Sequence, residues 1–172
     1  MFNGVPVEVK EIKKHNPDLE TITFNRGLLA EPGQFVMLYV PGVGEKPFSL
    51  SNNNSVTVEK RGAFTEKLFD LEKGDIFYVR GPLGKGFEMR NYVAIAGGCG
   101  IGPLSFLETS GRVELLLYGA RTEDCLIKDM CHSGQTQVQF STDNGSFGHH
   151  GLVTELITEE IVQNYNRFAI CG

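Results

Sequence analysis

The stretch Ala96-Gly97-Gly98-Cys99-Gly100-Ile101-Gly102-Pro103 follows the apolar run 93–96 and decides how the second half of the chain folds. Its closely spaced glycines let the backbone approach a phosphate, and a helix beginning directly afterwards adds free N–H groups and its dipole. Pro103 suits the first position of that helix, where its missing N–H costs nothing. The pattern is not G-x-G-x-x-G, because Pro103 stands where the third glycine is needed. The stretch predicts a phosphate-binding turn between a strand and a helix; the alternative is a tight turn without a ligand.

Strands and helices alternate in the rest of this half. The runs 93–96 and 113–117 are nearly continuously apolar, which is typical of parallel strands covered on both faces. We expect strands at 92–96, 112–118, 136–141 and 167–171, and helices from 103, near 123–131 and over 152–163. The alternation predicts a small α/β domain with a parallel sheet over residues 91–172.

The first half has a different character. All seven prolines lie at or before residue 103, and segments rich in Val, Ile, Phe, Tyr or Thr are bounded by Gly, Pro, Asn or Asp. These segments predict strands at 6–10, 20–24, 34–40, 47–51, 55–60 and 75–80, with a helix at 63–71 that caps or plugs them. An antiparallel β-barrel or sandwich over residues 1–90 follows. The predicted fold class is therefore α+β with two domains.

Composition excludes several classes of partner. The 172 residues carry 16 basic and 21 acidic side chains, a net charge of −5, whereas nucleic-acid binding requires clustered Lys and Arg. No apolar run is long enough to cross a membrane, and the N-terminus lacks a signal-peptide pattern, so we expect a cytoplasmic protein. The four cysteines include no C-x-x-C pair and predict neither a metal site nor a disulfide framework. The sequence leaves open whether the chain forms a homo-oligomer.

Further motifs follow one another along the chain. They are Lys46-Pro47-Phe48-Ser49-Leu50-Ser51, Arg61-Gly62-Ala63-Phe64-Thr65, Gly81-Pro82-Leu83-Gly84-Lys85-Gly86-Phe87, and the segments 117–122 and 141–148. Each is common alone. In this order, together with the glycine turn, they resemble the flavin- and nicotinamide-binding modules of the ferredoxin-NADP reductase superfamily. The chain is most similar to the electron-transfer subunit of dihydroorotate dehydrogenase, from residue 33 to residue 172.

The resemblance implies a flavin site in residues 1–90. It implies that the isoalloxazine ring lies against Pro47, Phe48 and Ser49, with Ser49 as a catalytic residue near the nitrogen that accepts hydride. It implies that the flavin pyrophosphate is held by Lys46, Gly62 and Thr65, the last two at a helix start.

A nicotinamide site is implied in residues 91–172. The pocket is implied to consist of Gly98, Cys99, Gly100 and Pro103, with Cys171 as a second catalytic residue that closes over the reacting ring. The adenosine half of the dinucleotide is implied to face Arg121 and Asp143.

Two departures from the family pattern bear on function. Lys46 stands where the family usually has arginine, and lysine offers a phosphate a point charge in place of a bidentate fork. The family continues beyond the final Cys171-Gly172 into a cysteine-rich segment, so no iron-sulfur cluster is expected within these 172 residues.

The function implied by the resemblance is that of an FAD-dependent NAD(P)H oxidoreductase. It passes electrons to a partner, either the catalytic subunit of dihydroorotate dehydrogenase, in pyrimidine biosynthesis, or another redox protein. One alternative is a stand-alone NAD(P)H:flavin or quinone reductase, and another is a non-catalytic flavin-binding module. FAD is expected over FMN. The choice between NADH and NADPH stays open, because Arg121 suits a 2′-phosphate and Asp143 repels one.

Overall fold

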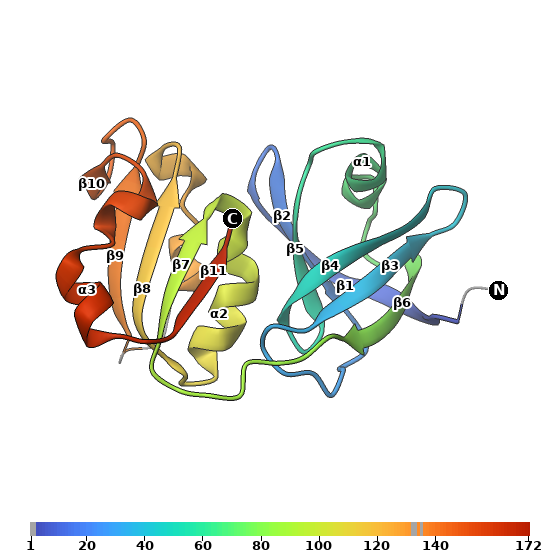
Figure 1. Cartoon of the computed structure of the whole chain (residues 1–172). Helices are drawn as coiled ribbons and strands as arrows, with labels where there is room; N and C mark the ends of the chain where they lie inside the picture. Colours follow the sequence, from blue (N-terminus) through green and yellow to red (C-terminus); the bar gives the residue numbers. More distant parts are fainter. Residues whose placement is uncertain (1–2, 132–133, 135) are drawn as a thin grey trace. The chain divides into compact units, whose positions relative to one another are not determined.

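Six antiparallel strands of the first half close into a barrel. The computed structural model describes residues 3–131, 134 and 136–172 and divides the chain into two compact units, one ending at Phe87 and one beginning at Glu88 (Figure 1). Around the barrel the strands follow the order β1-β2-β5-β4-β3-β6. Their bounds are β1 Val5–Asn16, β2 Leu19–Phe24, β3 Phe35–Val40, β4 Gly44–Asn52, β5 Ser55–Glu59 and β6 Ile76–Leu83.

Strand β1 is much longer than the predicted segment 6–10 because it serves two neighbours. Its first part, Val5 to Glu8, pairs with β6, and its second part, Val9 to Asn16, pairs with β2. The register shifts between Val9 and Glu11, where a bulge bends the strand. This bend lets one strand close the barrel, and the sequence pattern of a single short strand does not reveal it.

The barrel core consists of inward side chains from all six strands. Val36, Leu38, Leu50 and Phe77 are fully buried there. Helix α1 (Ala63–Phe69) lies at one end of the barrel (Figure 1), where its Leu68 is fully buried. The predicted cap is therefore present, and its helix ends two residues earlier than the sequence pattern indicates.

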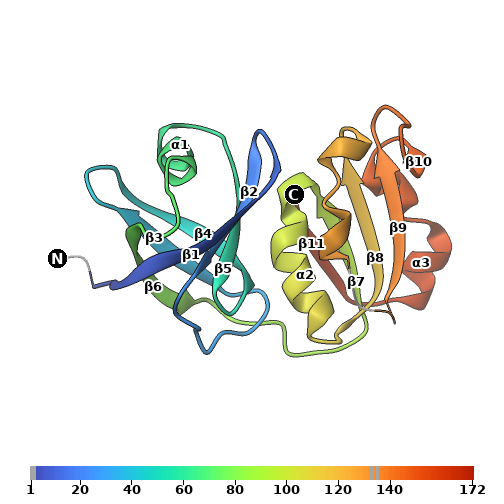
Figure 2. The same ribbon diagram turned by 180° about the vertical axis from the view of Figure 1, so that it is seen from behind.

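A five-stranded parallel sheet forms the second unit. Its order is β10-β9-β8-β7-β11, with β7 Tyr92–Gly97, β8 Val113–Ala120, β9 Gln137–Thr142, β10 His149–His150 and β11 Phe168–Cys171. Helix α2 (Ile101–Thr109) lies on one face, and α3 (Glu159–Asn164) with the 3₁₀ turn η4 (Val153–Leu156) lies on the other (Figures 1 and 2). An antiparallel barrel followed by a parallel sheet confirms the predicted fold class.

The helix predicted near 123–131 is wrong. The segment forms two separate 3₁₀ turns, η2 (Glu123–Cys125) and η3 (Lys128–Met130). The Ile127 N–H between them donates to the buried Tyr118 hydroxyl at 3.1 Å, and Ile127 itself is buried. A long-range hydrogen bond thus replaces the local one that a continuous helix requires.

The helix predicted over 152–163 is also wrong. The segment divides into η4 and α3, with Thr158 between them in an extended conformation. The Thr158 hydroxyl accepts a hydrogen bond from the Ile161 N–H at 3.3 Å, so Thr158 caps the start of α3. A capping residue is not helical itself, so the single helix that the apolar periodicity predicted is divided at Thr158.

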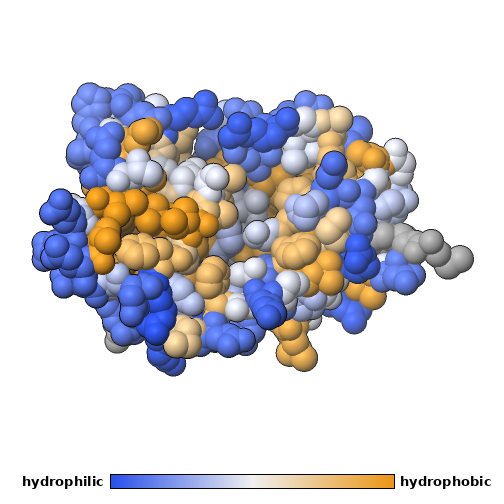
Figure 3. Space-filling view, viewed as in Figure 1, coloured by the Kyte–Doolittle hydropathy of each residue, from blue (hydrophilic) through white to orange (hydrophobic). Residues whose placement is uncertain are grey.

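The short elements η4 and α3 cover their face of the sheet incompletely. Figure 3 shows apolar side chains gathered on one face of the C-terminal unit, and Ile170 on edge strand β11 is 72% exposed. Among the described residues, no helix is both long and apolar enough to cross a membrane.

Candidate functional site

The residues predicted to touch the flavin ring lie on β4, opposite β3. Phe48 pairs with the fully buried Val36, so its side chain points to the interior side of the barrel. There its ring stacks on Phe64 of α1, with centroids 5.9 Å apart. Pro47 and Ser49 alternate to the other side and are exposed. The strand therefore does not bring all three side chains to one surface, and their contact with one ring stays a prediction.

Lys46, on the same strand, provides an uncompensated positive charge. Its side chain is exposed and has no ion-pair or hydrogen-bond partner in the described part of the chain. The neighbouring Glu45 does not neutralise it, because one Glu45 oxygen accepts from Arg80 Nε at 3.1 Å and Nη2 at 3.0 Å. A free ammonium group at this place fits the phosphate of a flavin nucleotide.

Thr65 organises the start of α1. Its Oγ1 accepts hydrogen bonds from the N–H of Arg61 at 2.8 Å and of Gly62 at 3.1 Å, and donates to the Gly62 carbonyl at 2.9 Å. The hydroxyl is thus occupied by the backbone. The predicted role of Gly62 and Thr65 in holding a pyrophosphate requires these bonds to be exchanged and stays a prediction.

The glycine turn lies where β7 ends and α2 begins. Gly98 to Gly100 form a 3₁₀ turn, η1, and α2 starts at Ile101. Gly98 has φ +51° with open space where a Cβ would lie, whereas a Cβ on Gly100 would collide with the Cys171 carbonyl. Pro103 is the third residue of the helix, which corrects its predicted first position. Its missing N–H is still harmless, because the first turn of a helix leaves those groups unpaired.

The predicted nicotinamide residues meet at the carboxyl edge of the sheet. In the parallel register, Cys171 of β11 lies opposite Ala96 of β7, and Gly97 lies opposite Gly119 of β8. The chain runs from β7 to β8 on one side and returns to β11 on the other, so the connections reverse direction at β7. Open α/β sheets bind their ligands outside the carboxyl ends of the strands at such a reversal point. The structure brings the glycine turn and Cys171 together there.

Two cysteines of this unit, Cys131 and Cys171, are buried enough to favour the neutral thiol. Burial raises the pKa of Cys171, and burial with the nearby Glu108 and Asp129 raises the pKa of Cys131 to about 12. A thiol nucleophile or redox thiol needs a lowered pKa. Cys171 therefore fits a neutral wall of the predicted nicotinamide pocket.

We expect iodoacetamide to modify Cys171 and Cys131 slowly at pH 7, because only the thiolate reacts and the raised pKa values keep it scarce. The rate should still be rising above pH 9, the ordinary pKa of a cysteine thiol. Peptide mapping by mass spectrometry after timed alkylation measures each site. Complete modification of Cys171 within minutes at pH 7 would contradict this assignment.

Arg121 and Asp143 are neighbours although 22 positions separate them. They follow directly on β8 and β9, and backbone hydrogen bonds continue the pairing past the strands, from Asp143 N to Ala120 O at 3.1 Å and from Asn144 N to Arg121 O at 3.3 Å. Both side chains are exposed, and neither has a side-chain partner within the residues that the structure describes. An unpaired cation beside the carboxyl edge fits a dinucleotide phosphate or ribose.

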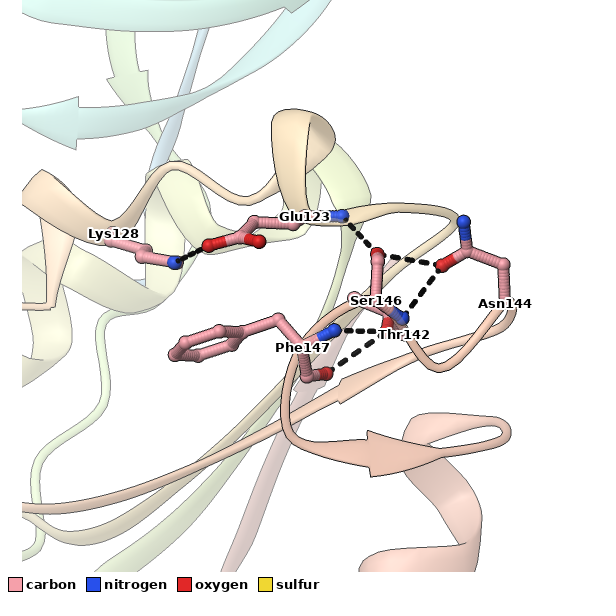
Figure 4. A network of polar contacts seen from close by, with 6 residues as sticks. All are labelled: Glu123, Lys128, Thr142, Asn144, Ser146 and Phe147. Carbon is pink, nitrogen blue, oxygen red and sulfur yellow. Dashed lines mark hydrogen bonds and ion pairs between the residues drawn. The ribbon is translucent and has the colours of Figure 1, made fainter.

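Sequence reasoning missed the side chains that hold this part of the edge together. Figure 4 shows Glu123, Lys128, Thr142, Asn144, Ser146 and Phe147 in one network. The segment 141–148 suggested only Asp143 as a site residue. Its run of small polar residues with two glycines is the signal for a side-chain-bonded turn.

Known proteins similar to the chain were found by sequence and by structure, and no family model matches it. A Pyrococcus horikoshii protein named "Probable dihydroorotate dehydrogenase B (NAD(+)), electron transfer subunit" is 38% identical over 170 residues, covering 96% of this chain and 68% of the relative. A Methanocaldococcus jannaschii protein of the same name is 36% identical over 180 residues, covering 100% and 70%. The chain thus spans about two thirds of the length of these relatives.

Solved structures agree on the fold. A ferredoxin NADP+ reductase from Neisseria gonorrhoeae with bound FAD and NADP superposes with a TM-score of 0.79 at 18% identity, covering 100% of this chain and 86% of that one. An NADH-dependent reduced ferredoxin-NADP oxidoreductase gives a TM-score of 0.77 at 24% identity, with 91% and 63% covered. The motif resemblance is thereby confirmed, and the chain belongs to the family of dihydroorotate dehydrogenase B electron transfer subunits.

Proposed function

We propose that the chain is a flavin-dependent oxidoreductase that takes electrons from a nicotinamide dinucleotide and passes them to a partner subunit. In this proposal, residues 1–90 bind FAD and residues 91–172 bind the dinucleotide. One observation carries it: the glycine turn and Cys171 meet at the reversal point of the sheet, and Arg121 and Asp143 follow β8 and β9 at the same carboxyl edge. The names of the relatives support the partner, a dihydroorotate dehydrogenase catalytic subunit.

The bound flavin supplies hydride acceptance and electron release, and the chain supplies binding and orientation. Lys46 binds a flavin phosphate, and exposed Pro47 and Ser49 offer a contact surface on the other side of the same strand. At the sheet edge, Gly98 leaves open space next to the backbone for the dinucleotide. Arg121 and Asp143 contact its adenosine half.

NADH is the proposed donor. The relatives carry NAD(+) in their names, and the exposed Asp143 carboxylate repels the 2′-phosphate that distinguishes NADPH. Arg121 then serves the pyrophosphate or ribose. The ratio of kcat/KM for the two donors measures this preference directly.

The purified chain, reconstituted with FAD, is expected to be yellow and to bleach when NADH is added without oxygen. A flavin-free sample and a sample without NADH are the controls. A protein that binds neither FAD nor FMN contradicts the proposed function. Bleaching followed by electron transfer to a dihydroorotate dehydrogenase catalytic subunit that co-purifies with it supports the subunit role, whereas turnover with free flavin or quinones alone favours a stand-alone reductase.

Lys46→Ala is expected to weaken FAD binding about tenfold, because it removes a charge-assisted phosphate contact. Lys46→Arg is the matched control and should bind FAD at least as tightly, since its guanidinium can bind a phosphate through two N–H groups. Fluorescence quenching of FAD on binding measures both affinities. Equal affinity of Lys46→Ala and wild type would remove Lys46 from the site.

A further inference from the structure

We propose that Ser146 is a positioning residue for the adenosine half of the dinucleotide. In this inference, its hydroxyl locks the loop after β8 to the loop after β9 and so holds Arg121 and Asp143 in a binding arrangement. The inference rests on the function proposed above, and it adds a residue that does not itself touch the ligand.

The Ser146 hydroxyl joins two loops through one oxygen. It accepts a hydrogen bond from the Glu123 N–H at 2.8 Å and donates one to Asn144 Oδ1 at 2.7 Å (Figure 4). Asn144 Oδ1 also accepts from the Ser146 N–H at 3.1 Å, which closes the turn locally. The hydroxyl therefore donates its one proton within its own loop and accepts from the loop after β8.

The other side of the same loops is joined by charge. Lys128 Nζ lies 2.6 Å from Glu123 Oε1 and 3.5 Å from the centroid of the Phe147 ring. Phe147 is in turn held by its backbone, since its N–H donates to Thr142 Oγ1 at 3.0 Å and its carbonyl accepts from the same hydroxyl at 2.9 Å. Two separate contacts thus connect the loops, from Glu123 to Ser146 and from Lys128 to Phe147. The residues that make or support them are called the loop clasp below: Glu123, Lys128, Asn144, Ser146 and Phe147.

Arg121 and Asp143 lie at the base of the loop clasp. Arg121 precedes Glu123 by two residues, and Asp143 lies between Thr142 and Asn144. The clasp residues are engaged with one another, whereas these two charged side chains are exposed and have no side-chain partner in the described ranges. The arrangement orders the backbone and leaves the charges available, which reduces the ordering cost of binding.

Binding of fragments separates positioning from general stability. Calorimetric titration of the FAD-reconstituted chain with NAD+, which does not react with oxidised flavin, is compared with titration of nicotinamide mononucleotide, which lacks the adenosine half. Ser146→Ala is expected to weaken NAD+ binding about tenfold and to leave mononucleotide binding unchanged. Thr109→Ala, which removes an exposed hydroxyl at the end of α2, is the matched control and should bind both as wild type does.

A double variant tests the route through Arg121. If Ser146 acts by positioning Arg121, then Ser146→Ala should weaken NAD+ binding only slightly further when Arg121→Ala is already present. Lys128→Met opens the loop clasp from its other side and gives the same result by a second route, should Ser146→Ala fold poorly. Three outcomes overturn this inference and leave the proposed function standing. They are wild-type NAD+ affinity in Ser146→Ala, equal weakening of NAD+ and mononucleotide binding, and full additivity of Ser146→Ala with Arg121→Ala. A wild-type chain that does not bind NAD+ overturns the proposed function as well.

Discussion

The Gly100→Ala variant is expected to lose saturable NAD+ binding and about 3 kcal/mol of unfolding free energy. A Cβ on Gly100 would overlap the carbonyl carbon and oxygen of Cys171 and would lie 2.9 Å from the Gly172 nitrogen. All three are backbone atoms, so no side chain can turn aside. Relief requires β11 to move away from β7, with which Cys171 pairs through Ala96. The same displacement changes the glycine turn and the Cys171 wall, so fold and pocket are disturbed together.

Gly98→Ala is the matched control for Gly100→Ala. Gly98 has φ +51°, so alanine costs roughly 1 kcal/mol of backbone strain, but its Cβ meets open space. The contrast isolates the collision from the loss of glycine flexibility. Urea unfolding followed by circular dichroism measures the stability of both variants, and NAD+ titration measures the pocket of Gly100→Ala. Gly98→Ala is a control for stability alone, because its Cβ would enter the space left for the dinucleotide. Gly100→Ala with wild-type stability and affinity would show that β11 does not restrain the turn.

Glu20→Gln is expected to stabilise the barrel at pH 8 by about 1–3 kcal/mol and to change little at pH 4. Glu20 lies on the inward side of β2, in line with Ile22 and Phe24, and is 0% exposed. Neither carboxylate oxygen has a hydrogen-bond partner within the described chain. Burial raises the pKa of Glu20 above its usual 4.5, while the nearby Lys14 and Lys60 act in the opposite direction.

The sign of the pH effect follows from the raised pKa. Between pH 4.5 and the raised value, the folded barrel keeps a proton that the unfolded chain releases. The contribution of Glu20 to stability is therefore complete below pH 4.5 and is lost as the pH rises through the folded pKa. Glutamine stays neutral at every pH and removes this loss.

Urea unfolding at several pH values measures the effect of Glu20→Gln on the free energy of unfolding. Hydrogen exchange of the β2 amides measures the same effect within the barrel. Glu11→Gln, at an exposed position of β1, controls for the change in net charge. The quantity to compare is the difference in unfolding free energy between wild type and Glu20→Gln. If this difference is the same at pH 4 and pH 8, the pKa of Glu20 does not change on folding.

Local patterns predicted most of the fold. Alternation in the first half and the apolar runs at 93–96 and 113–117 respond to burial, which acts on each strand through its own side chains. The predictions that were wrong involve long-range partners. The helix near 123–131 is broken by the Tyr118 hydroxyl, and the one over 152–163 is interrupted by the Thr158 cap. Apolar periodicity in the sequence gives no sign of either hydrogen bond.

The sequence by itself determined the two kinds of sheet, the place of the glycine turn and the family, because each depends on residue types in chain order. Only the tertiary structure decided what surrounds those residues. The parallel register of β7 with β11 places Cys171 over Gly100, and the closed barrel puts an unpaired Glu20 inside. Register also brings Arg121 beside Asp143 and lets Ser146 connect their loops. Such contacts join residues far apart in the chain, and their energies depend on distance in space, which residue order does not encode.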